Sequence, residues 1–109
     1  MLEPILGSTS SERVLIFIFC RNEGYAREIA RFFGSDPDSI HKQLVRLESG
    51  GVLAGKTAGR TRLYSFNPGY PFLNELKMLL EKAMQFYTAE ERENLLMNRR
   101  RPRRGGKPL

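Results

Sequence analysis

A short stretch near the middle of the sequence concentrates positive charge at what reads as a turn. The segment GGVLAGKTAGRTRLYSFNP, residues 50–68, contains Lys56, Arg60 and Arg62 and no acidic residue. Ammonium and guanidinium groups bind phosphates through charge-assisted hydrogen bonds. Three cations on a protruding turn, with no acid in the segment to neutralise them, therefore predict contact with a polyanion such as a nucleic-acid backbone.

A second set of candidate residues lies on the segment just before this turn, SDPDSIHKQLVRLESGG. Helical spacing places Ile40, Leu44 and Leu47 on one buried face, which leaves the opposite face polar. Polar side chains on an exposed helix face can reach base edges in the major groove of DNA. The candidates on this helix are Ser39, His41, Lys42 and Arg46. With the three cations of the turn they form the predicted DNA-binding set.

The residue types that catalysis and metal binding require are scarce. His41 is the one histidine and Cys20 the one cysteine, and they fall in different predicted helices. The sequence has no phosphate-binding glycine motif and no metal-ligand spacing. We therefore predict no enzyme activity, no metal and no cofactor. Cys20 lies in an apolar run, which predicts a buried structural thiol rather than a redox sensor.

Length and charge distribution predict one small domain and a basic tail. The chain has 109 residues, of which 40% are hydrophobic, enough for one folded core. The net charge of +6 comes from the C-terminal RRRPRRGGKPL, because residues 1–98 carry equal numbers of cations and acids. We predict a folded domain over residues 1–98 and a disordered basic tail over residues 99–109. Such a tail either follows a polyanion or only keeps the chain in solution.

The elements that must position these residues begin with a helix. In STSSERVLIFIFCRNEG, Thr9 and Glu12 fit a capping box. The apolar residues that follow have helical spacing, although VLIFIF also fits a strand. We predict a helix that ends at Gly24. The same apolar run is too short to span a membrane, and no cationic leader precedes it, which predicts a cytoplasmic protein.

Two more helices and a hairpin follow. YAREIARFFG is short and amphipathic and ends at Gly34, and Asp36 with Pro37 suits the start of the next helix. Two helices joined by so tight a turn predict a helix-turn-helix motif over residues 26–50. The hairpin over residues 52–66 then forms a wing beside it.

A C-terminal helix over residues 71–87 completes the predicted fold. Its apolar stripe is wider than one small core requires, so it could close the core or pack on a second chain. We predict a homodimer whose interface consists of Phe72, Leu73, Leu76, Leu80 and Met84. The fold class is mainly α with a small β-hairpin: a winged helix-turn-helix domain followed by a C-terminal dimerisation helix.

From about residue 9 to residue 87 the chain resembles the winged helix-turn-helix transcriptional regulators of the ArsR/MarR-like kind. The matching pieces are REIARFFG, SDPDSIHKQLVRLESGGVL and GRTRLYSFNP. The resemblance implies a cytoplasmic prokaryotic regulator, a homodimeric repressor that binds double-stranded DNA. Metal-sensing members use cysteine or histidine clusters, so the presence of Cys20 and His41 alone does not carry that role over. Tyr25 stands where the family often has a capping Ser or Thr.

The passage LYSFNPGYPFLNEL also looks like the small winged-helix proteins found in prokaryotes beside nucleotidyltransferase-like genes. This likeness keeps a second interpretation open, in which the chain is an adapter that docks a nucleotidyltransferase-like protein. A third interpretation is a nucleoid-type binder that grips any duplex. The basic wing favours DNA binding over the adapter, because a pure adapter has no use for exposed cations there.

Overall fold

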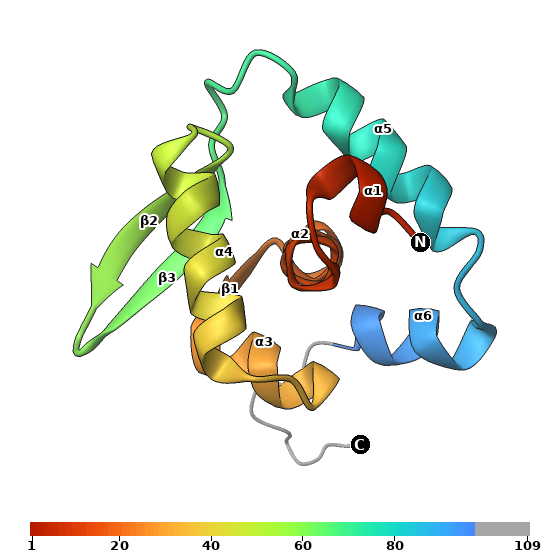
Figure 1. Cartoon of the computed structure of the whole chain (residues 1–109), viewed down its shortest axis with the longest axis horizontal. Coiled ribbons are helices and arrows are strands. Elements are labelled where there is room, and N and C mark those ends of the chain that lie inside the picture. The colour runs from red at the N-terminus through yellow and green to blue at the C-terminus, as the bar shows by residue number, and fades with distance from the viewer. Residues whose placement is uncertain (98–109) are drawn as a thin grey trace.

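The computed structural model describes residues 1–97 and shows a mainly helical chain with one small sheet (Figure 1). The elements in chain order are α1 (Glu3–Leu6), α2 (Thr9–Arg21), β1 (Glu23–Tyr25), α3 (Ala26–Phe33), α4 (Pro37–Ser49), β2 (Leu53–Ala58), β3 (Thr61–Phe66), α5 (Leu73–Met84) and α6 (Ala89–Leu96). Helix α2 lies at the centre, and the other helices and the sheet surround it. None of these helices combines the length and apolar character that crossing a membrane requires.

Helix α2 confirms the helical interpretation of the VLIFIF run. The five residues from Val14 to Ile18 are all buried, so the helix is enclosed on every side and its apolar residues need not alternate. The predicted cap is wrong by one residue: Ser8 caps the helix, and its Oγ accepts from the Ser11 amide at 3.0 Å. The helix also ends earlier than predicted, at Asn22, which adopts a left-handed φ of 73°.

Glu12 does not complete a capping box because its side chain turns inward, where it is 5% exposed. Its Oε1 accepts from the Leu2 amide at 2.7 Å, and its Oε2 accepts from the Tyr87 hydroxyl at 2.7 Å. Burial and this hydrogen bond raise the pKa of Tyr87. Glu12 therefore joins the start of the chain to the segment between α5 and α6.

The sheet has three strands in the order β1-β3-β2, whereas the sequence predicted only the hairpin. Strand β1 pairs antiparallel with β3, and Gly24 lies opposite Tyr64. A side chain at Gly24 would not fit, because its Cβ would lie 2.9 Å from Cε1 of Phe17. Glycine at this position thus lets the sheet approach α2 closely.

The helix-turn-helix motif forms as predicted. Gly34 ends α3 with a left-handed φ of 63°. Asp36 is the N-cap of α4, its Oδ1 accepting from the Asp38 amide at 3.2 Å, and Pro37 occupies the first helical position. At the start of α3, Tyr25 has no side-chain cap, but its amide donates to Oε1 of Glu28 at 3.2 Å. The motif is therefore capped from within α3 rather than by a Ser or Thr.

Helix α5 is shorter than the predicted 71–87 and covers one side of α2 (Figure 1). Leu80 and Met84, which were predicted in a dimer interface, are buried in the core of the chain itself at 0% and 8% exposure. The physical reason is that the inner face of α5 packs on α2. Helix α6 begins with a capping box, since the amide of Glu91 donates to Oγ1 of Thr88 at 3.0 Å.

The thiol of Cys20 faces α5, with its Sγ 3.7 Å from Sδ of Met84. Burial raises the pKa of Cys20 to about 11. Because the thiolate is the reactive form, we expect Cys20 to react with a disulfide reagent at pH 8 about 100-fold more slowly in the folded protein than in denaturant. Spectrophotometric titration with and without urea measures this ratio. Cys20 is half-buried, and equal rates would contradict its partial shielding by α5.

Candidate nucleic-acid interface

A cleft of about 630 Å³ separates the wing from the helix-turn-helix motif. Its lining brings together side chains from three elements: Arg27 at the start of α3, His41 on α4, and Arg60 and Arg62 of the β2–β3 hairpin. Three of these were predicted as DNA-binding residues from separate parts of the sequence. The fold therefore places the polar face of α4 beside the basic tip of the wing.

The exposed face of α4 carries His41, Lys42 and Val45. Within residues 1–97 Lys42 makes no hydrogen bond or ion pair, so its ammonium group is available to a ligand. Ser39 is half-buried, and its hydroxyl donates to Oδ2 of Asp36 at 3.1 Å. Its oxygen still has accepting capacity, but the hydroxyl proton is used at the helix start.

Arg46 differs from the sequence prediction. Its guanidinium group donates to three oxygens: Oε1 of Gln43 at 2.8 Å, Oγ of Ser11 at 3.0 Å and the carbonyl of Leu6 at 3.2 Å. The last two bonds tie α4 to the end of α1 and to the first turn of α2. Helical spacing alone places Arg46 on the outer face of α4. Only the packing of α1 shows that its guanidinium group is already hydrogen-bonded to other parts of the chain.

The three wing cations are not equivalent. Lys56 and Arg60 are exposed and form no ion pair in the described part of the chain. Arg62, predicted to lack an acidic partner, forms a salt bridge with Glu48 at the end of α4, 2.5 Å from Nη2 to Oε2. This bond lowers the pKa of Glu48. The ion pair is therefore complete at neutral pH and is lost only as the pH falls through that lowered pKa.

Arg27 is a candidate that the sequence analysis did not select. It lies in the first turn of α3 and lines the cleft opposite the wing. The amides at a helix start are oriented toward an anion, and a cation there adds to this attraction. Little in the sequence indicates that Arg27 binds DNA, because the acidic Glu28 follows it directly. Only the folded sheet places Arg27 across the cleft from Arg60.

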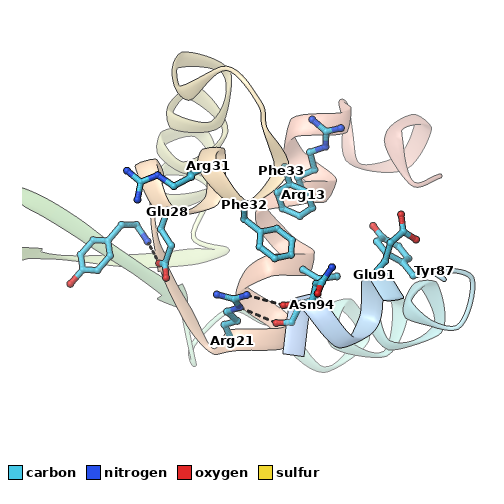
Figure 2. Close-up of a pocket in the computed structure, with 11 residues that line it drawn as sticks. Arg13, Arg21, Glu28, Arg31, Phe32, Phe33, Tyr87, Glu91 and Asn94 are labelled. Carbon is cyan, nitrogen blue, oxygen red and sulfur yellow. Dashed lines mark hydrogen bonds between the residues drawn. The ribbon is translucent and has the colours of Figure 1, made fainter. Parts of the chain in front are cut away.

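A larger pocket of about 1040 Å³ lies on another side of the molecule, between α2, α3 and α6 (Figure 2). Arg21 is buried at its floor and donates to the carbonyls of Leu95 and Asn94, each at 2.9 Å. Its guanidinium carbon also lies 5.0 Å from the ring centroid of Phe32. Arg21 thus anchors the end of α6 to α2, a role that the sequence did not reveal.

Among residues 1–97 no group of three or more His, Cys, Asp or Glu side chains could hold a metal ion. The basic tail predicted at residues 99–109 lies outside the part that the structure describes. The candidate interface consequently consists of α4, the wing and the start of α3.

A comparison with solved structures identifies the fold. A mutant of MarR from E. coli superposes with a TM-score of 0.57 over 86% of this chain and 76% of that chain, at 21% sequence identity. The chain has the winged-helix fold of the MarR-like regulators. This confirms the predicted fold class and the MarR-like side of the resemblance.

Two further solved structures share this winged-helix fold. A mutant of ZitR from Lactococcus lactis in apo form has a TM-score of 0.54 and 21% identity, covering 78% of this chain and 73% of that chain. AdcR, the adhesin competence repressor from Streptococcus pyogenes, has a TM-score of 0.52 and 14% identity, covering 84% of this chain and 77% of that chain. No protein-family model and no curated protein matches the sequence. MarR, ZitR and AdcR are transcription regulators and not enzymes.

Proposed function

We propose that the chain is a sequence-specific regulator of transcription that binds double-stranded DNA in the cytoplasm of a prokaryote. Helix α4 would enter the major groove with His41 and Lys42 toward the bases, and the wing would contact flanking phosphates through Lys56 and Arg60. The observation that carries the proposal is the cleft whose lining brings His41 of α4 together with Arg60 and Arg62 of the wing and with Arg27. The regulator would act as a repressor, as the adhesin competence repressor AdcR does by name.

We further propose a homodimer formed through the outer face of α5. Phe72, Met78 and Phe86 are 62%, 68% and 68% exposed, although they are large and apolar. One winged domain makes few phosphate contacts, and specific regulators usually bury roughly 1,000–2,500 Å² of protein surface on DNA. A second copy would supply a second α4, and two half-sites separated by roughly 34 Å, or a multiple of it, would form an inverted repeat.

The dimer proposal predicts a large effect at Met78. We expect Met78→Glu to dissociate the dimer, because a carboxylate on each copy would be desolvated in the interface. Sedimentation velocity would show the monomer, and affinity for an inverted repeat would fall about 100-fold because the half-sites would bind separately. Met78→Leu keeps the apolar contact and is expected to remain dimeric. A Met78→Glu protein that sediments like the unchanged protein would refute this interface.

The DNA-binding proposal is tested by selecting bound duplexes from a random pool and measuring their affinity by fluorescence anisotropy across a salt series. A selected duplex should bind at least about 1,000-fold more tightly than a scrambled one at 150 mM salt. Equal and steeply salt-dependent binding would instead favour the nucleoid-type interpretation. Absence of binding to either duplex would leave the exposed face of α5 as a docking surface for a protein such as a nucleotidyltransferase-like partner.

A further inference from the structure

We propose that Arg62, Glu48 and Gly55 form a lock that holds the wing in register with the recognition helix. Arg62 is then a positioning residue for DNA binding and not a phosphate contact. This inference rests on the proposed function and deepens it, because it divides the wing cations into two that face DNA and one that sets their position.

The lock begins with the path of the Arg62 side chain. Arg62 lies on β3 opposite Thr57 of β2. Its guanidinium group crosses β2 and donates to the Gly55 carbonyl at 3.1 Å and to Oγ1 of Thr57 at 3.3 Å. Beyond β2 it reaches Glu48, where Nε donates to Oε1 at 3.2 Å and Nη2 to Oε2 at 2.5 Å. Both carboxylate oxygens are engaged, a two-point contact that restricts the relative orientation of the partners.

Gly55 provides the space for this path. A Cβ at this position would lie 2.5 Å from Nε of Arg62 and 3.0 Å from its Cζ. The backbone of Gly55 is not in the left-handed region, so its conformation does not require glycine. Glycine weakens a strand and is therefore expected where another group approaches closely. Here the approaching group is the guanidinium of Arg62.

The lock connects the two parts of the interface. Glu48 belongs to the last turn of α4, and Arg62 lies two residues from Arg60 at the wing tip. Figure 1 shows the hairpin extending away from the body of the molecule, so its tip is free to pivot unless a side chain ties it to the body. Arg62 lies opposite Thr57, one residue pair from the Ala58–Thr61 pair at the turn, so its ion pair with Glu48 holds the hairpin near its tip. The ion pair thereby sets the distance between the bases read by α4 and the phosphates contacted by Arg60.

The lock and a direct phosphate contact predict opposite results for Glu48→Gln. Removal of an acid near DNA strengthens binding if Arg62 is simply freed to contact phosphate. If the lock positions the wing, Glu48→Gln weakens binding to a selected duplex about tenfold despite the gain of one positive charge, and it lowers the salt slope by about one. Arg62→Lys keeps the charge but cannot engage both oxygens, so it should weaken binding by a similar factor.

Gly55→Ala tests the same idea without changing any charge. We expect it to weaken binding about tenfold in the unchanged background and to have no further effect when Arg62 is replaced by Gln. Hydrogen exchange of residues 53–66, measured without DNA, should speed up in Glu48→Gln and Gly55→Ala, while circular dichroism should show that both variants remain folded. Affinities equal to or tighter than that of the unchanged protein would overturn the lock. Failure of the unchanged protein to bind any duplex would instead overturn the proposed function.

Discussion

Reversing both free wing cations, with Lys56→Glu and Arg60→Glu together, is expected to lower affinity for a selected duplex at least about 100-fold. Each cation that neutralises a phosphate contributes about 0.9 to the slope of log affinity against log salt, so the slope should fall by about two per wing. Both side chains are exposed and form no ion pair within residues 1–97, so their loss leaves the folded chain intact. Fluorescence anisotropy across a salt series measures both quantities.

The matched control places the same charge change elsewhere. Lys77→Glu with Lys82→Glu alters the net charge equally but lies on α5, away from the cleft. Because α5 also carries the proposed dimer face, sedimentation velocity must first show that this variant sediments like the unchanged protein. We expect this variant to lose less than about tenfold in affinity, because charges farther than a Debye length of about 8 Å are largely screened at 150 mM salt. If the two double variants lost affinity equally, binding would depend on net charge alone and the proposed interface would be wrong.

Arg21→Ala is expected to lower the free energy of unfolding by about 3 kcal/mol, because it removes two hydrogen bonds to helix-end carbonyls, one buried and one partly buried, and two cation–π contacts. Arg21 is 7% exposed and lies 4.8 Å from the ring centroid of Phe17. Its two carbonyl acceptors belong to the last turn of α6. Urea unfolding measures the loss of stability, and hydrogen exchange at residues 89–96 should show that α6 is the helix that loosens.

Arg13→Ala is the control for this prediction. Arg13 lies on the same helix and over the ring of Phe33 at 5.5 Å, but no side-chain hydrogen bond joins it to α6. We expect this variant to lower the free energy of unfolding by about 1 kcal/mol or less, which is the contribution of a partly exposed cation–π contact. A loss in Arg21→Ala no larger than that in Arg13→Ala would show that the bonds to α6 contribute nothing to stability.

Local signals allowed most of the helix-turn-helix motif to be predicted. Asp36, Pro37 and Gly34 act through their own backbone positions, so their roles can be read from a few neighbouring residues. Strand β1 could not be found in this way. Its three residues have no pattern of their own, and they form a strand only because β3 lies beside them.

Errors among the site residues arose where a side chain finds a partner far away in the sequence. Arg46 reaches the carbonyl of Leu6 forty residues earlier, and Arg62 reaches Glu48 across β2. Helical spacing or charge clustering identifies these residues as polar and exposed, but it cannot show which of them are already bonded within the chain. The burial of the apolar residues around α5 could not be predicted for a different reason. Leu80 and Phe72 are both apolar, and only the packing of α5 on α2 determines that Leu80 is buried and Phe72 exposed.

The burial of α2 on every side also affects whether the unfolded protein aggregates. The segment VLIFIF, residues 14–19, has no charge, no proline and no glycine, and it is rich in residues that favour strands. Such hexapeptides form tightly packed cross-β aggregates when their backbone becomes free to pair with other chains. In the native fold these residues are helical, and the surrounding elements shield most of them from water. Heating at high concentration should therefore end in aggregation rather than reversible unfolding, and variants that loosen the helices around α2 should aggregate at lower temperature.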